Sequence, residues 1–426
     1  MDLRKEIKFS DLLPKRGKSE SAAEAVSDQN PPREKPAKEK RSFSFARKAK
    51  GAAEPKEPKQ PKRAKPKTPK ERRPARHKKI VGLKIGASQL AAARVVNNGS
   101  PEVVQLARAG LEPGIVVGGE LREPEALATA LRAFFREHKL PRQAVRLGIA
   151  SNRIGVRTFE IGGIEDPKQL ENAIRFRAQE ALPIPLEEAV LDYQLLGETV
   201  DDEGVTKHRV ILVVAYRDLV ERYVAACKKA GIKLAGVDLE AFALLRALGD
   251  RPADAGNAAI VVAAVGSDRS TLAVSNGETC EFTRVIEWGG MNLNVAIARA
   301  LDTTPSEAEP VKLSLNLLEP AEAMDLDPER AARVRTAVHG ELQTFARELV
   351  SSLQFYQGQP GSLGIAEIVL TGGTAQMPGL DAELTRLIGA RVRVGDPLSR
   401  VERGKKLGDG HALGSLAVAI GLGIES

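Results

Sequence analysis

The sequence predicts an α/β protein made of two similar halves with a cleft between them, preceded by a basic tail. One observation is a short apolar strand that runs into a Gly/Ser turn at Val81–Ser88. Another is the recurrence of this pattern at Ile260–Ser267. Turns of this kind direct backbone N–H groups at phosphate. A phosphate-type turn that occurs once in each half therefore indicates a duplicated fold.

The tail, residues 1–79, differs in composition from the rest of the chain. It holds 26 Lys+Arg against 11 Asp+Glu, whereas residues 80–426 hold 38 against 45, so the net charges are +15 and −7. Ten of the 25 prolines also lie in the tail. Such a segment buries too little apolar surface to offset chain entropy, so we expect it to be disordered.

Two short segments interrupt the tail. Glu6–Pro14 has apolar residues spaced for one small face, as short docking motifs do. Arg41–Arg47 combines two aromatic residues with basic ones, which suits anionic lipid headgroups. The alternative for both is a solvated linker. The tail's charge also allows nucleic-acid binding, but contact with an anionic membrane surface is the more economical use of it.

Cysteine usage and apolar run lengths point to the cytoplasm. Cys227 and Cys280 are too few for a disulfide framework or a metal-ligand cluster, which fits a reducing compartment. The longest apolar stretches, Ala258–Val265 and Leu416–Leu422, are shorter than the roughly 18 residues of a membrane span. We therefore expect any membrane contact to be peripheral or through a partner.

The first half is predicted from its apolar periodicity. Two strands, at 80–85 and 89–96, are joined by the turn Gly86-Ala87-Ser88. A helix begins near Glu123-Pro124, where proline is tolerated in the first turn. A strand follows at Val145–Ala150. The helix has a buried stripe at helical spacing, formed by Leu127, Leu131, Phe134 and Phe135.

The middle of the chain has a different character. A helix over Pro167–Ala181 should end at Leu182-Pro183-Ile184-Pro185, because two prolines force an extended exit. The remaining predicted elements of this region are paired strands at 190–196 and 208–215, a helix at Leu219–Ala230 and a strand at Lys233–Val237.

The second half repeats the strand–turn–strand order. The predicted strands are Ala258–Val265, Thr271–Ser275 and Glu281–Glu287, with helices at Met291–Leu301 and 329–356. A late strand, Ile368-Val369-Leu370, leads into the turn Thr371-Gly372-Gly373-Thr374.

Two phosphate-type turns and a late Thr-Gly-Gly turn form the layout of the actin/sugar-kinase/Hsp70 ATPase fold. Over roughly residues 80–424 the chain resembles the PilM family, actin-like and FtsA-related cytoplasmic proteins of type IV pilus assembly. Motifs in family order carry the resemblance: Phe176–Glu188, Leu191–Gln194, Val237–Leu244, Gly289-Gly290, Glu307-Ala308-Glu309 with Lys312, and Leu370–Leu380.

The resemblance implies a domain organisation. The fold would be an actin-like ATPase fold with duplicated RNase H-like lobes and an inserted small α+β subdomain, after the disordered basic tail. The first lobe would start at 80–160, the inserted subdomain and the return to the first lobe would cover 161–236, and the second lobe would cover 237–426.

The resemblance also implies a partner. PilM-like proteins bind the cytoplasmic N-terminal peptide of PilN, a single-span protein, and so join the inner-membrane platform of a pilus or a related secretion system. The peptide is expected in a groove beside the inserted subdomain. The matching positions here are Phe176, Leu182, Ile184 and Pro185, for which ordinary subdomain core is the alternative.

Family members can hold ATP between the lobes, so the resemblance implies a set of nucleotide-contacting positions. Here the two turns depart from the family pattern, because Lys84 and Ala264 stand where acidic residues orient water around Mg²⁺. We therefore predict a degenerate site with no metal and no catalytic residue. The positions that remain for a nucleotide are Gly86, Ala87, Ser88, Gly266, Ser267, Glu309, Lys312, Gly372 and Gly373.

Lys84 has three interpretations. Its ammonium replaces the metal as the counter-charge of a phosphate, or reaches Asp268 in the opposite turn, or is a surface lysine at a drifting site. We hypothesise the pair with Asp268, which would contribute about 1 kcal/mol at a partly exposed site. Asp238 and Glu240, at a helix start, are interpreted as charges that complement the helix dipole.

The leading prediction is therefore a non-catalytic interaction protein. An active ATPase of the actin/Hsp70 fold is the enzyme alternative, and Lys84 and Ala264 speak against it. A nucleic-acid-binding protein is the third possibility, supported by the basic tail alone.

Overall fold

The structure is a computed structural model that describes residues 78–425 except 165, 182–184, 201–203, 253–255, 360, 406 and 408–412. The predictions for residues 1–77, including both tail segments, lie outside the described residues.

The described strands are β1 Lys79–Ile85, β2 Gln89–Asn98, β3 Ser100–Gly110, β4 Val116–Val117, β5 Glu120–Leu121, β6 Val145–Ile149, β7 Ile154–Gly162, β8 Ala189–Val200, β9 Thr206–Tyr216, β10 Leu234–Leu239, β11 Ala259–Val265, β12 Ser270–Ser275, β13 Cys280–Ile286, β14 Ile365–Thr371, β15 Val392–Val394 and β16 Glu402–Arg403.

The described α-helices are α1 Pro124–Glu137, α2 Pro167–Ala181, α3 Arg217–Lys229, α4 Glu240–Leu248, α5 Gly290–Leu301, α6 Pro305–Ser314, α7 Pro328–Gln357, α8 Leu380–Ile388 and α9 Ala417–Gly423. Short 3₁₀ helices occur at η2 Leu186–Glu188, η3 Ala321–Ala323, η4 Thr374–Gln376 and η5 Leu413–Leu416.

Two sheets share one topology. The first has the order β10-β6-β1-β2-β3, with β16 added at its edge, and the second has the order β15-β14-β11-β12-β13. In each, the first strand pairs antiparallel with the second and parallel with a later strand. The third strand of each sheet is antiparallel to the second. The predicted duplication of the fold is therefore confirmed at the level of strand order and direction.

Helices α4 and α9 lie between the two sheets. On one side, α9 packs on the first sheet so closely that a Cβ on Gly82 of β1 would lie 2.0 Å from the carbonyl oxygen of Ala419. On the other side, α4 and α9 share an apolar cluster with the second sheet, through residues such as Val262 and Val369. The lobes are thus joined through this buried helix pair.

The two helices of the pair touch at a glycine. A Cβ on Gly421 of α9 would lie 1.8 Å from the carbonyl oxygen of Ala243 in α4. Arg146, buried in β6, fastens the same end of α9 by donating from Nη1 to the carbonyls of Leu422 and Ile424, at 3.0 and 2.9 Å. These bonds satisfy carbonyls that a helix C-terminus leaves without helical partners.

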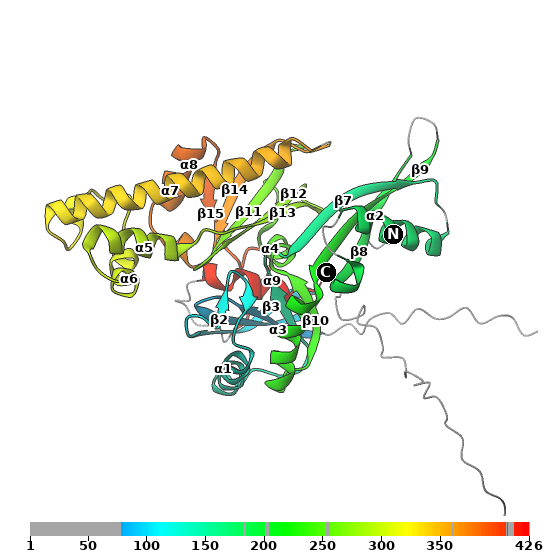
Figure 1. Cartoon of the computed structure of the whole chain (residues 1–426), viewed down its shortest axis with the longest axis horizontal. Helices are drawn as coiled ribbons and strands as arrows, with labels where there is room; N and C mark the ends of the chain where they lie inside the picture. The colour runs from blue at the N-terminus through cyan, green and yellow to red at the C-terminus, as the bar shows by residue number, and fades with distance from the viewer. Residues whose placement is uncertain are drawn as a thin grey trace, which may run out of the picture. The chain divides into compact units, whose positions relative to one another are not determined.

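Further helices cover the outer faces of the sheets (Figure 1). α1 and α3 join the apolar core of the first sheet, and the predicted stripe of α1 is buried there. α5, α7 and α8 cover the second sheet, where Trp288 stacks on Phe345 of α7 at 4.1 Å between ring centroids.

The inserted subdomain is a third sheet, of order β7-β9-β8, with α2 on one face. Ile174 and Ala178 of α2 pack on Val210 and Leu212 of β9. β7 runs beside β13 of the second lobe, where Arg209 pairs with Glu281. The strand β8 lies at the other edge of the sheet.

None of the helices in the described part of the chain is long and apolar enough to cross a membrane. Cys227 and Cys280 are buried with free thiols. Burial raises the pKa of both thiols, to about 12 for Cys227, so both stay protonated near neutral pH.

We expect Gly421→Ala to destabilise the protein by about 1–3 kcal/mol or more, because the new methyl group would collide with the backbone of α4. The matched control is Gly340→Ala in α7, where a Cβ meets no atom within 4 Å. That change should stabilise by about 0.5–1 kcal/mol through helix propensity. Urea unfolding measures both, and equal effects would contradict the close contact.

Candidate functional site

The phosphate-type turns have the same backbone geometry in both lobes. After β1, the Gly86 N–H donates to the carbonyl of Gln89 at 2.9 Å. After β11, the Gly266 N–H donates to the carbonyl of Arg269 at 3.0 Å. Both turns therefore close in the same way at the end of a central strand, and the similarity in sequence corresponds to a similarity in structure.

The second turn is fixed by neighbouring elements of its own lobe. The carbonyl of Gly266 accepts from the Gly290 N–H at 2.9 Å and from the Thr374 hydroxyl at 3.1 Å. The carbonyl of Ser267 accepts from the Met291 N–H at 2.8 Å. The first N–H groups of α5 and the turn after β14 thus converge on one short loop.

The two predicted glycines after β14 have different surroundings. Gly372 has a φ of +99°, and a Cβ on it would lie 2.2 Å from the carbonyl oxygen of Val265, so glycine is required there for the turn and for packing. A Cβ on Gly373 would meet no atom within 4 Å. Gly373 therefore borders open space, and Gly372 does not.

Lys312 of α6 lies beside this loop. Its Nζ is 3.8 Å from Glu309 and would be 3.5 Å from a Cβ on Gly290. Burial lowers the pKa of Lys312, and the negative charge of Glu309 acts in the opposite direction. The structure thus brings Lys312 and Glu309 to the N-terminus of α5. Glu307, from the same motif, instead completes the capping box of α6 with Thr304.

Lys84 has a buried partner that the sequence did not reveal. Its Nζ lies 3.3 Å from Oε2 of Glu240, and the two side chains are 17% and 3% exposed. Lys84 stands in register with Gly148 of β6, where a Cβ would lie 2.7 Å from Cδ1 of Leu422 in α9 and 3.5 Å from Cγ of Glu240. Glycine at this position thus lets α9 pack closely on β6 next to the ion pair.

The predicted pairing of Lys84 with Asp268 is therefore wrong. Lys84 lies on the sheet face that α9 and α4 cover, so its nearest acid is at the start of α4. Asp268 accepts from the backbone N–H of Gly118 at 2.8 Å and lies 3.4 Å from Arg269. Asp268 does join the two lobes, but through the hairpin β4–β5 and not through Lys84.

Arg269 strengthens the contact with this hairpin. Its side chain is 7% exposed, and its guanidinium carbon would lie 3.1 Å from a Cβ on Gly119. The hydroxyl of Tyr223 donates to the carbonyl of Gly119 at 3.1 Å. The hairpin therefore requires glycine at position 119. Through this hairpin, the first lobe contacts the turn that follows β11 in the second lobe.

The remaining acids near the first turn serve the fold. Asp238 pairs with Arg246 of α4, and Glu240 pairs with Lys84. Complementing the helix dipole is thus an incomplete explanation for either residue. The Oε1 atom of Glu240 is buried without a hydrogen-bond partner among the described residues. Ala264 is 4% exposed and belongs to the apolar cluster between the sheets.

The predicted peptide residues are only partly described. Phe176 is 61% exposed on α2, and Pro185 is exposed before η2. Leu182 and Ile184 lie outside the described residues. Phe176 stands on the side of α2 opposite Ile174, because two residues turn a helix by about 200°. Ordinary subdomain core is therefore the wrong interpretation for Phe176.

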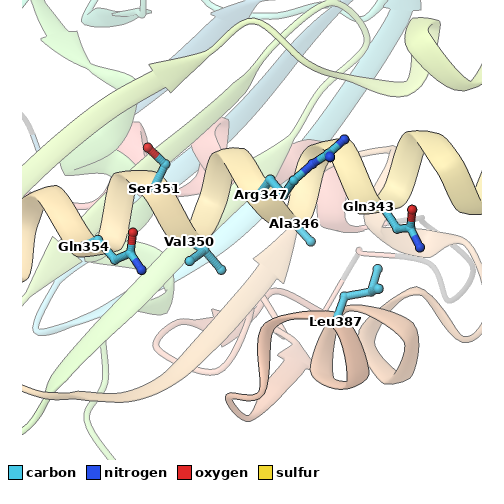
Figure 2. A pocket seen from close by; sticks show the side chains of 7 residues that line it. All are labelled: Gln343, Ala346, Arg347, Val350, Ser351, Gln354 and Leu387. Atoms are coloured by element: carbon cyan, nitrogen blue, oxygen red, sulfur yellow. The ribbon is translucent and has the colours of Figure 1, made fainter.

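A separate hollow of about 580 Å³ lies on the surface between α7 and α8. Figure 2 shows that α7 contributes most of its lining side chains and that Leu387 comes from α8. It is not lined by any residue of the phosphate-type turns. Its lining residues are Gln343, Ala346, Arg347, Val350, Ser351, Gln354 and Leu387.

Within the described ranges, no three or more His, Cys, Asp or Glu side chains are grouped to hold a metal ion. Three contributors were not predicted from the sequence: Arg146, which holds the end of α9; the glycine hairpin at Gly118-Gly119, which contacts the second turn; and Glu240 as the partner of Lys84. An arginine within the apolar strand 145–150 was a usable signal for the first, and the glycine pair was one for the second.

Known proteins resemble this chain along most of its length. The family model for the type IV pilus assembly protein PilM matches residues 82–426. A chain of a solved "PilM-PilN type IV pilus biogenesis complex" is 25% identical with a TM-score of 0.68, and the alignment covers 81% of this chain and 97% of that one.

Cell division proteins are similar too. FtsA of Escherichia coli K12 is 26% identical over 363 residues, which cover 76% of this chain and 85% of the relative. FtsA of Bacillus subtilis is 23% identical over 326 residues, which cover 68% and 71%. The fold is the actin-like ATPase fold, as predicted. The chain belongs to the PilM family of type IV pilus assembly proteins.

Proposed function

We propose that this protein is a non-catalytic platform component that binds the cytoplasmic N-terminal peptide of a PilN-like inner-membrane protein. It would work in the cytoplasm, peripheral to the inner membrane through that partner, in a pilus or a related secretion system. The observation that carries the proposal is the match to 97% of a chain in a solved "PilM-PilN type IV pilus biogenesis complex". In the same proposal, the basic tail adds affinity for anionic lipid.

The exposed residues of the inserted subdomain support the peptide site. Phe176 is a large aromatic side chain that remains mostly in water on α2. Pro185, which follows residues 182–184 in the sequence, is exposed as well. A peptide that covers both would remove this apolar surface from water, which is the main favourable term in association.

The residues at the first turn do not fit a metal ion. Mg²⁺ at such a site is held by carboxylates through its waters. Lys84 places an ammonium where the family has the acid, and this ammonium already pairs with the nearest buried carboxylate, Glu240. The second acidic position is Ala264, inside an apolar cluster. We derive no hydrolytic step from this site.

The phosphates of a nucleotide would be bound by groups other than the missing metal ligands. Both turns keep their backbone geometry, Gly373 borders open space, and Lys312 supplies a partly buried cation near the start of α5. In this proposal the cleft can accept ATP through backbone N–H groups and Lys312, without a protein-anchored metal. The nucleotide would then hold the lobes and would not be turned over.

We expect Lys84→Gln to destabilise the protein by about 3–5 kcal/mol, because it leaves the carboxylate of Glu240 buried without a counter-charge. The double variant Lys84→Gln with Glu240→Gln should recover most of that loss. Denaturant unfolding of both single variants and the double variant measures the coupling. Strictly additive effects would show that the pair does not interact in solution.

We expect ATP to bind with the same affinity in Mg²⁺ and in EDTA, with no turnover above the buffer rate. Calorimetry and phosphate release measure the two quantities. The comparison variant is Lys84→Asp with Glu240→Gln, which places one carboxylate at the first turn without a second buried carboxylate beside it, so its ATP affinity should depend on Mg²⁺. If the unaltered protein hydrolyses ATP as fast as this variant, the degenerate-site proposal is wrong.

We expect Phe176→Asp to weaken binding of a PilN-like N-terminal peptide by at least tenfold, since about 1.4 kcal/mol of buried aromatic contact would be lost. The matched control is Phe355→Asp on α7, because Phe355 is 58% exposed and Phe176 is 61% exposed. Fluorescence anisotropy with a labelled peptide measures both. Equal affinities for the two variants would place the peptide elsewhere.

A further inference from the structure

The inserted subdomain leaves an apolar edge uncovered by described residues. Within the described residues, β8 pairs with β9 alone and forms the outer strand of its sheet. Tyr193 and Leu195 of β8 stand opposite Leu212 and Val210, so they share the face on which α2 packs. Because α2 lies mainly over β7 and β9, Tyr193 and Leu195 remain 37% and 41% exposed.

Charged groups border this edge on two sides. On the α2 side, Glu171 pairs with Arg175 at 2.9 Å. Burial and then the charge of Glu171 raise the pKa of Tyr193, which places the phenol beside that helix. On the strand side, residues 186–200 contain no lysine or arginine, and their acids are Glu187, Glu188, Asp192 and Glu198. The surface therefore suits a peptide that combines apolar with basic residues.

The chain itself contains such a peptide, outside the described residues. Ile7 and Phe9 alternate with Lys8 and Ser10, so an extended conformation would place the two apolar side chains on one side. Leu12 and Leu13 follow. Residues 1–16 as a whole hold five basic residues (Arg4, Lys5, Lys8, Lys15 and Arg16) against three acidic ones (Asp2, Glu6 and Asp11), so the net charge of this peptide is +2. Adding a strand to an exposed sheet edge is a general mode of peptide recognition, with specificity from alternate side chains.

We propose that residues 6–14 bind along the outer edge of β8 in the same molecule, with Ile7 and Phe9 against Tyr193 and Leu195. The segment thereby covers the start of β8, next to Pro185, and competes with the partner peptide. The competition rests on the function proposed above, whereas the self-docking does not. A partner that displaces residues 6–14 from β8 would then make the protein available for assembly.

The connecting chain makes this geometry accessible. Residues 15–77 separate the motif from the start of the described fold. A chain of that length has a root-mean-square span of roughly 45 Å, and proline-rich chains extend further. Such a tether gives an effective concentration of about 1 mM. A motif with a Kd of about 100 μM would then be bound most of the time and would weaken a competitor about tenfold.

The first experiment compares full-length Phe9→Asp with full-length Phe43→Asp, which makes the same change in the other aromatic segment of the tail. Hydrogen exchange is followed in peptides that cover β8. We expect faster exchange of β8 in Phe9→Asp alone, and renewed protection when a synthetic peptide of residues 1–16 is added. Equal exchange of β8 in both variants and the unaltered chain would overturn self-docking.

A second experiment locates the surface. Anisotropy of labelled peptide 1–16 is measured on Phe9→Asp carrying either Leu195→Asp or Val394→Asp, two positions that are each 41% exposed. Binding should be lost with Leu195→Asp and kept with Val394→Asp, and retention in both would overturn the proposed surface. Circular dichroism confirms that both variants fold.

The last measurement separates this inference from the function proposed above. A PilN-like peptide should bind Phe9→Asp about tenfold more tightly than the unaltered chain. If the PilN-like peptide binds neither Phe9→Asp nor the unaltered chain, while protection of β8 still depends on Phe9, the proposed partner is wrong and the self-docking proposal is retained. If protection disappears on dilution as dimers dissociate, the occupant is a second copy of the chain, and the intramolecular proposal is overturned.

Discussion

The contact between α4 and α9 is the constraint on which the rest of the described structure depends. Each helix belongs to an apolar layer that two sheets cover from opposite sides, so neither sheet can shift without moving the pair. The approach is possible because Gly421 has no Cβ where the backbone of Ala243 passes. This contact also determines where the ion pair forms. Lys84 of β1 and Glu240 at the start of α4 lie on the same side of the first sheet.

The resulting ion pair of Lys84 and Glu240 brings opposite charges together in the interior beside the first turn. Burying an ammonium and a carboxylate costs desolvation that their attraction only partly offsets, so the pair defines an arrangement more than it adds net stability. Above it, Asp268 holds the N–H of Gly118 and Arg269 lies against Gly119. The lobes are thus fastened at the second turn by groups of the chain itself.

Local sequence pattern was sufficient to predict the duplicated fold, because each central strand and its glycine turn form a short contiguous segment and this segment occurs twice. It was insufficient for α9, whose seven residues are apolar on every side and lack helical periodicity. The strand β7 was also missed, since its exposed and half-buried residues give little alternation. At the site, the turns and the group around Lys312 were predictable from motifs. The partner of Lys84 was not, because it depends on strand register and on the packing of α4 against the first sheet.

The union of Lys84 with Glu240 also has an evolutionary consequence. A substitution that placed an acid at position 84 alone would set two carboxylates against each other in a water-poor interior, which costs several kcal/mol. Loss of Glu240 first would instead leave the ammonium of Lys84 without its counter-charge. Each single change at this pair therefore leaves one charged group buried without its partner. Lys84 and Glu240 are expected to change together or not at all, so the two positions should vary jointly among related sequences.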